Sequence, residues 1–250
     1  MGKYRQQVLK AARELIIEKG LFEFSMRDLA KATGLSVGSL YREVRNKDDL
    51  LLLGAAENIR RHGMGLNQVK TLGLNSAEQI MFQIGFAPYC IDFVDMDSDN
   101  MGTNFLLSNC DLVGRATPET VEELQGYFKQ YRQQVVDLVD GLIHEQAFSN
   151  GKVQAMEVIA DLSILCRGTR VLRVMRTNIM FRPNLVPTEK LCQLGELVLR
   201  QLDWNIDGPL LDPKKMDLAW KTAMDQSQML SMSLKKRASS RISGSSPSDA

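Results

Sequence analysis

Residues 25–47 read SMRDLAKATGLSVGSLYREVRNK, and this stretch decides the fold. Ser25 stands three positions before Asp28, which is the capping-box pattern of a helix start. Apolar residues then recur at helical spacing, and Gly34 stands where a left-handed glycine commonly ends a helix. The pattern therefore predicts a short helix over residues 26–33, followed by a tight turn.

A second helix follows that turn. Ser36 is placed to act as its N-cap, with the hydroxyl accepting a backbone N–H two or three residues further on. The helix would run from Val37 to Val44, roughly 12 Å at about 1.5 Å per residue, and the DNA major groove is about 12 Å wide. Two short helices joined by a glycine-bearing turn form the helix-turn-helix arrangement that enters DNA.

The same residues also fit a different pattern. Residues 34–38, GLSVG, match the Gly-x-Ser-x-Gly nucleophile elbow of serine hydrolases. An elbow needs a buried strand immediately before it, whereas the preceding residues predict a helix. It also needs a histidine partner, and the two histidines, His62 and His144, carry no local signature. The helix-turn-helix hypothesis is therefore favoured over a hydrolase, and we expect no enzyme.

The stretch resembles the DNA-binding head of the TetR family of bacterial transcription regulators. The family pattern is a Thr/Ser helix start, Ile/Leu-Ala, then Gly-Val/Leu-Ser-x-Gly-x-Leu-Tyr and Lys-x-x-Leu. The matching positions are Ser25, Leu29, Ala30, Gly34, Leu35, Ser36, Gly38, Ser39, Leu40, Tyr41, Val44, Lys47 and Leu50. Most members have a His or aromatic residue where this chain has Glu43, and an aromatic residue at Val44. The resemblance is specific over residues 5–53 and mainly architectural beyond residue 60.

The resemblance implies a role for each matched position in DNA binding. Ser36 would cap the recognition helix. Base edges would be contacted by Val37, Gly38, Ser39 and Arg42. Phosphates would be contacted by Tyr41 and Lys47, and the preceding helix would clamp the DNA backbone through Ser25 and Arg27. Phosphate contacts position a protein on DNA, while groove-facing residues select the sequence.

Charge is distributed unevenly along the 250 residues, although the net charge is only +1. Residues 1–61 hold 12 Lys and Arg against 8 Asp and Glu, and residues 62–233 hold 15 against 21. The excess of positive charge, which favours binding to DNA phosphates, therefore lies in the same part of the chain as the helix-turn-helix motif. No apolar run approaches the roughly 18 residues of a membrane span, and no secretory signal is expected. The four cysteines show no paired spacing, which is typical of a reduced, cytoplasmic protein without membrane contact.

The remaining pattern is helical, so we expect an all-α fold. Helices are predicted over 4–19, 47–61, 76–93, 102–114, 118–147, 153–177, 188–203 and 213–230, with a glycine-interrupted connection over 62–75. The predicted organisation is a helix-turn-helix domain at 1–50, a helical effector-binding and dimerisation domain at 51–230, and a disordered tail at 231–250. The tail is rich in Ser and poor in large apolar residues.

The body is rich in Met and aromatic residues, most of which are expected to form an ordinary core. The resemblance implies a ligand cavity among these helices, and a cavity lined by Met and aromatic side chains suits an apolar small molecule. The candidate ligand-binding residues are Met81, Phe82, Phe86, Tyr89, Phe93, Phe105, Tyr127 and Tyr131. The family's two-fold dimer interface would use Met156, Ile159, Ile164, Val171, Leu191, Leu194 and Val198.

Three further features weigh against an additional site. Residues 95–102, DMDSDNMG, begin like a calcium loop, but Asn100 replaces the turn glycine and Leu106 the bidentate glutamate. The arginines repeating every third residue from Arg167 to Arg176 drift around their helix, so they cannot all face one ligand; most are expected in surface or interface ion pairs, with the alternative that one or two hold an acidic effector. The histidines lack metal-ligand spacing, and neither a metal nor a cofactor is expected.

The resulting hypothesis is a homodimeric, sequence-specific DNA-binding regulator, of the kind that is most often a repressor in this family. It would bind a palindromic operator on double-stranded DNA and be released by an apolar small-molecule effector. One alternative is a transcriptional activator, or a ligand-independent DNA-binding protein, of the same fold. Another alternative is a helical enzyme or binding protein that kept a degenerate DNA-binding head.

Overall fold

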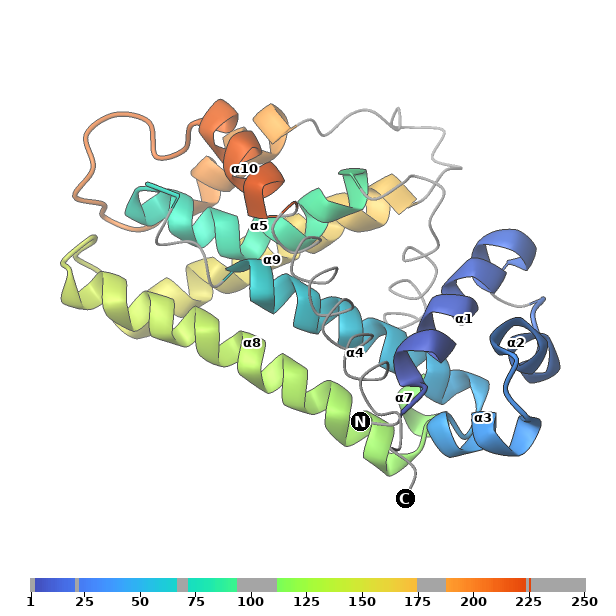
Figure 1. Cartoon of the computed structure of the whole chain (residues 1–250). Helices are drawn as coiled ribbons and strands as arrows, with labels where there is room; N and C mark the ends of the chain where they lie inside the picture. Colours follow the sequence, from blue (N-terminus) through green and yellow to red (C-terminus); the bar gives the residue numbers. More distant parts are fainter. Residues whose placement is uncertain are drawn as a thin grey trace, which may run out of the picture.

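The computed structural model describes residues 3–20, 23–66, 72–93, 112–174, 188–223 and 225. Every element of regular structure in these ranges is a helix, apart from one isolated bridge between Phe148 and Trp204 (Figure 1). The predicted all-α fold is confirmed. The predicted tail at 231–250 and the calcium-like loop at 95–102 lie outside the described residues.

The head consists of three short helices packed against the start of a long one. They are α1 (Arg5–Lys19), α2 (Met26–Thr33), α3 (Val37–Glu43) and α4 (Lys47–Leu66). One apolar cluster unites them, with Val8, Leu29, Leu40 and Leu52 fully shielded from solvent. Gly34 ends α2 with φ of 68°, a left-handed conformation that costs glycine little. The head therefore folds as its local sequence signals predict.

The helix α4 is longer than predicted. It was expected to end near residue 61, before the glycine-interrupted connection, but it continues through Gly63 to Leu66. A glycine inside a helix costs roughly 1 kcal/mol relative to alanine. A Cβ on Gly63 would stand 3.7 Å from Gln134 Oε1, an ordinary contact, so the packing of α4 against α8 does not require the glycine. Tertiary packing against α8 thus overrides the local helix-breaking signal.

The body contains the remaining helices. They are α5 (Ser76–Phe93), α7 (Leu112–Arg115), α8 (Pro118–His144), α9 (Lys152–Val174), α10 (Thr188–Leu199) and a helical segment at 213–223. The start of α8 at Pro118 agrees with the prediction, whereas α10 ends four residues before the predicted residue 203. Of the helix predicted over 102–114, only the last residues are described, as part of α7.

The body core is built around α5, which packs against α9 and α10. Trp220, from the helical segment 213–223, is completely buried and donates from Nε1 to the Phe82 carbonyl at 3.2 Å. A Cβ on Gly85 would lie 2.7 Å from the Trp220 ring, so only glycine permits this approach. The C-terminal helical segment is therefore an integral part of the core.

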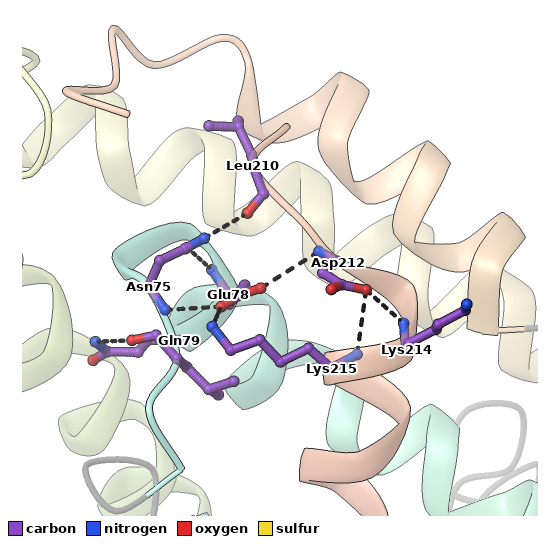
Figure 2. Close-up of polar contacts among 8 residues, drawn as sticks. Asn75, Glu78, Gln79, Leu210, Asp212, Lys214 and Lys215 are labelled. Carbon is purple, nitrogen blue, oxygen red and sulfur yellow. Dashed lines mark hydrogen bonds and ion pairs between the residues drawn. The ribbon is translucent and has the colours of Figure 1, made fainter. Parts of the chain in front are cut away.

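A polar network fastens that segment to the start of α5 (Figure 2). Asn75 and Glu78 cap α5 reciprocally: Glu78 N–H donates to Asn75 Oδ1 and Asn75 N–H donates to Glu78 Oε2, both at 2.8 Å. The buried Glu78 carboxylate also accepts from Lys215 Nζ at 2.6 Å and from the Asp212 N–H at 3.4 Å. Asn75 Nδ2 donates to the Leu210 carbonyl at 3.1 Å. One carboxylate thus joins segments more than 130 residues apart.

We expect Glu78→Gln to lower the free energy of unfolding by about 1–3 kcal/mol, because the substitution leaves Lys215 without its counter-charge and the Asn75 and Asp212 donors with a neutral acceptor. Urea denaturation of the full chain measures the change. The matched control is Glu14→Gln, which removes an exposed pair with Lys10 at 3.6 Å and should cost about 0.5 kcal/mol or less. Equal losses in the two variants would contradict a structural role for Glu78.

Candidate nucleic-acid interface

The start of α2 carries the capping box that the sequence predicts. Asp28 N–H donates to Ser25 Oγ at 3.2 Å, and Ser25 N–H donates to Asp28 Oδ2 at 2.8 Å. The Ser25 hydroxyl also donates to Asp28 Oδ2, and Lys19 Nζ lies 2.9 Å from Oδ1. Hydrogen bonds from Lys19 and Ser25 hold the pKa of Asp28 well below its usual range. The Ser25 hydroxyl is therefore engaged in ordering the helix start.

The start of α3 is ordered by a chain of three side chains. Ser36 Oγ accepts from the Ser39 N–H at 3.2 Å, so Ser36 is the N-cap, as predicted. The Ser36 hydroxyl donates to Ser39 Oγ at 3.0 Å, and the Arg42 guanidinium donates to the same oxygen at 2.9 Å. Arg42 is thereby held one helical turn from Ser39, on the side of α3 away from the core. The arrangement presents a fixed guanidinium and hydroxyl to an outside partner.

The outer side of α3 also carries exposed apolar groups. Val37 and Tyr41 are 49% and 45% exposed, while Leu40 on the opposite side is completely buried. Gly38 lies between them, and a Cβ added there would meet no atom within 4 Å. Steric crowding within the chain thus does not require this glycine, although it weakens the helix. A glycine here lets an outside molecule approach the helix backbone closely.

Lys47 has partners inside the chain. Its Nζ donates to the Phe24 carbonyl at 3.0 Å and lies 4.1 Å from the centroid of the Phe24 ring. Desolvation on the half-buried Lys47 lowers its pKa from the usual value. The sequence identified Lys47 only as a phosphate contact, but the structure shows that it also fixes the chain before α2. The candidate cations Arg27 and Arg42 are exposed on α2 and α3.

The head is joined to the body by a buried carboxylate that the sequence analysis missed. Asp49, on α4, is 1% exposed and accepts from the Thr117 N–H at 2.7 Å and from the Thr117 hydroxyl at 3.0 Å. Thr117 is the N-cap of α8. A negative charge at a helix N-terminus is favourable, because the unpaired N–H groups there carry partial positive charge. Asp49 therefore ties the first turn of α4 to the first turn of α8.

Ion pairs surround this link. Arg5 at the start of α1 lies 2.6 Å from Glu123 on α8, and both side chains are mostly shielded from solvent. More exposed pairs join Arg115 to Asp48 at 3.5 Å and Arg45 to Glu119 at 3.9 Å. Asn46 Nδ2 also donates to the Arg115 carbonyl at 3.4 Å. The head thus contacts α7 and α8 through the beginnings of both α1 and α4.

The candidate ligand residues of the body fall into three groups. Met81, Phe82 and Phe86 are buried in the body core, where the Phe82 and Phe86 rings stack with centroids 5.6 Å apart. Tyr131 donates from its hydroxyl to the Gln83 carbonyl at 3.1 Å, whereas Tyr127 packs against the core of the head. Tyr89 and Phe93 belong to α5, but their side chains, like all of Phe105, lie outside the described part.

The candidate dimer residues divide similarly. Ile159 and Leu191 are buried in the body core, which corrects their assignment to an external face. The reason is that helical spacing shows which residues share a stripe but not which of two stripes faces inward. Met156, Leu194 and Val198 are half-buried, Ile164 is 69% exposed, and the Val171 side chain is outside the described part. Exposed apolar residues that the prediction omitted are Val153, Leu197 and Leu218.

No group of three or more His, Cys, Asp or Glu in the described ranges is arranged to hold a metal ion. No helix among the described residues is long and apolar enough to cross a membrane.

Comparison with known proteins agrees with the geometry of the head. Residues 8–53 match the family model described as bacterial regulatory proteins, tetR family. The matched range runs from within α1 through α2 and α3 to the first third of α4, and so includes both capped helices. A search of curated proteins found no significant match.

Several solved structures share the fold of the whole chain. The structure of the superantigen PfiT aligns with a TM-score of 0.53 and 18% identity, covering 82% of this chain and 98% of that one. A TetR-family transcriptional regulator from Agrobacterium tumefaciens gives 0.50 and 16%, covering 80% and 97%. AmtR from Mycobacterium smegmatis gives 0.50 and 20%, covering 88% and 94%. At these identities the likeness shows the fold. Residues 8–53 therefore match the N-terminal domain of the tetR family of bacterial regulatory proteins, and the chain as a whole shares the fold of these solved structures, one of which is a TetR-family regulator.

Proposed function

We propose that the protein is a homodimeric, sequence-specific transcription regulator in the cytoplasm that binds a palindromic operator and is released from it by an apolar small molecule. The observation that carries DNA binding is the outer side of α3. There the hydrogen-bonded Ser36, Ser39 and Arg42 stand beside the exposed Val37 and Tyr41. From the family resemblance we expect the protein to repress transcription and not to activate it.

The chemistry of this surface fits base edges in a major groove. An arginine guanidinium donates two parallel hydrogen bonds to guanine O6 and N7, and a valine methyl group can contact the thymine methyl. Arg42 and Val37 are the exposed groups of these kinds on α3. The open space around Gly38 allows the backbone to approach the DNA. Arg27 and Tyr41 supply donors for flanking phosphates.

A second copy of the chain is the partner that best fits the exposed apolar groups of the body. Ile164 on α9 and Leu197 on α10 are each 69% exposed, and these two helices pack against each other. Isolated exposed apolar residues are common, but two long aliphatic side chains on adjacent helices are typical of an interface. A two-fold axis here would bring four helices together and pair the two heads with a palindromic site.

We propose that the effector binds in the body, at residues 51–230, and acts on the head, at residues 1–50, through α4. This division is one of function and not of structure, because α4 belongs to the apolar core of the head, contacts α8 and α5 of the body, and crosses residue 50 without interruption. A shift of α8 against α5 would reach the head through the Asp49–Thr117 hydrogen bonds. A ligand that weakens operator binding tenfold must itself bind the DNA-bound dimer tenfold more weakly.

Selection of bound fragments from the source genome tests DNA binding directly. The purified full chain should enrich a palindromic sequence whose binding weakens steeply with added salt, because a dimer releases counterions at several phosphates. Arg42→Ala should weaken binding by about 1–3 kcal/mol and relax the base preference at one position of each half-site.

The control for this prediction is Arg132→Ala, which removes an exposed arginine of the body helix α8 and should leave operator binding unchanged. A uniform loss over all operator variants would place Arg42 on a phosphate. A purified dimer that enriches no sequence would contradict the proposed function and favour a helical binding protein with a degenerate head.

We expect Ile164→Glu to break the dimer, because two-fold symmetry would bury the new carboxylate from each subunit in an apolar contact. Light scattering of the eluting protein should show a dimer for the wild type and a monomer for the variant. Phe128→Glu, at a 45% exposed apolar residue on α8, is the matched control and should remain a dimer. Dissociation of both variants, or of neither, would contradict the proposed interface.

We expect Asp49→Ala to loosen the attachment of the head, since Thr117 loses both of its hydrogen bonds to the carboxylate. Wild-type binding should fall sharply when one base pair is inserted between the half-sites, and this penalty should shrink in the variant. Gel titration of each protein on the operator with and without the inserted base pair measures this loss of affinity. Asp48→Ala, which removes only the exposed pair with Arg115, should keep the wild-type penalty. An unchanged penalty in Asp49→Ala would show that this link does not position the head.

A further inference from the structure

One buried side-chain amide nitrogen in the body has no hydrogen-bond partner in the described part of the chain. Gln83, on α5, is 5% exposed, and its Nε2 donor is shielded from solvent without a hydrogen bond to any described residue. Gln79, one helical turn earlier, donates from its own Nε2 to the Leu74 carbonyl at 3.2 Å. An unpaired buried donor costs stability. An acceptor from outside the chain would therefore satisfy the Gln83 Nε2 and remove this cost.

The surroundings of Gln83 place it where α5 meets α8. Tyr131 on α8 donates to the Gln83 backbone carbonyl at 3.1 Å, so that carbonyl is already satisfied. Phe86, almost a full turn further along α5, is buried, and Val135 of α8, one turn beyond Tyr131, is buried as well. The unpaired Nε2 thus belongs to a part of α5 whose buried neighbours on α5 and α8 are aromatic and aliphatic. Such a setting favours an apolar molecule with a single polar group.

Two titratable groups near this position are neutral, and the cation that acts on Tyr131 is Arg167 of α9, whose side chain is exposed. Burial raises the pKa of Tyr131 to about 12, and burial likewise raises the pKa of the Cys166 thiol on α9 to about 12. Arg60 on α4 is already held by Glu57, with Nε 2.8 Å from the carboxylate. A bound carboxylate would therefore be buried with only the solvent-exposed Arg167 as a nearby counter-charge, which leaves most of the cost of its burial uncompensated. A neutral carbonyl oxygen accepts the amide hydrogen bond without that penalty.

We propose that Gln83 Nε2 donates a hydrogen bond to the carbonyl oxygen of the effector, and that the effector is a neutral, largely apolar ketone, lactone or ester. The proposal rests on the proposed ligand-responsive function and specifies its chemistry. Gln83 selects the effector, and the apolar residues around it supply most of the binding free energy. The hydrogen bond itself accounts for the preference for a carbonyl compound over a hydrocarbon of the same shape.

The test uses the full-length dimer and three carbonyl probes: 2-undecanone, γ-decalactone and cyclododecanone. Undecane and cyclododecane are the matched hydrocarbons, and undecanoate is the matched carboxylate. At least one carbonyl probe should raise the Tm and weaken operator binding, whereas the hydrocarbons and undecanoate should do so less. Calorimetry should show that Gln83→Met binds the active probe about two- to tenfold more weakly, as expected for the loss of one neutral hydrogen bond.

The ligand-free variants separate recognition from a structural role. Gln83→Met should unfold at the same or a higher temperature than the wild type, because it removes an unpaired donor. Gln79→Met, the matched control, loses a satisfied hydrogen bond, so its Tm should fall while probe binding stays unchanged. A lower Tm of Gln83→Met with unaltered probe binding would assign the amide to structure and overturn the proposal.

Two other results would also overturn it. One is equal binding of carbonyl probes and hydrocarbons to the wild type, and the other is no response to any of the three carbonyl probes. Operator titration without a probe accompanies each measurement. If operator binding persists while the carbonyl preference fails, only the assignment of Gln83 is lost, whereas absence of operator binding would defeat the proposed function itself.

Discussion

The arrangement of the head on the body depends on the buried carboxylate of Asp49. It accepts two hydrogen bonds from Thr117 and so joins the first turn of α4 to the N-terminus of α8. Such donors are needed at 1% exposure, because a buried carboxylate without hydrogen-bond partners is very unfavourable. The link is therefore both a stabilising contact and a constraint on direction, since it fixes where α4 enters the body.

A consequence of this constraint is that α4 can act as a rigid lever. Its first half packs with α1 and the recognition helix, and its second half lies along α8 and contacts α5. Figure 1 shows α4 running from the head to the body beside α8. A change in the packing of α8 would thus turn the head as a unit, because helices with packed cores move by discrete shifts and do not bend freely. This supports a mechanism in which effector binding alters the spacing of two recognition helices.

The two polar features of greatest functional interest differ in how they are satisfied. On α3, Arg42 and Ser39 are ordered by hydrogen bonds and still face outward, which reduces the entropy lost on contact with DNA. On α5, the Gln83 side-chain Nε2 is enclosed and lacks a partner among the described residues. The first surface is organised before it binds, while the second position is completed only by an added acceptor. Under the proposed function, the groups that contact DNA are exposed, whereas the amide that contacts the effector is buried.

The sequence alone determined the all-α class, the caps at Ser25 and Ser36, and the stop at Gly34, because these signals act between residues no more than four positions apart. It also indicated the outward side of α3, which follows from helical spacing. It did not determine that α4 continues past Gly63, that Lys47 binds the Phe24 carbonyl, or that Ile159 faces inward. The Asp49–Thr117 and Glu78–Lys215 contacts join residues 68 and 137 positions apart. Such partners are brought together only by helix packing, so no local pattern can report them, and the tertiary structure alone decided which polar groups are satisfied.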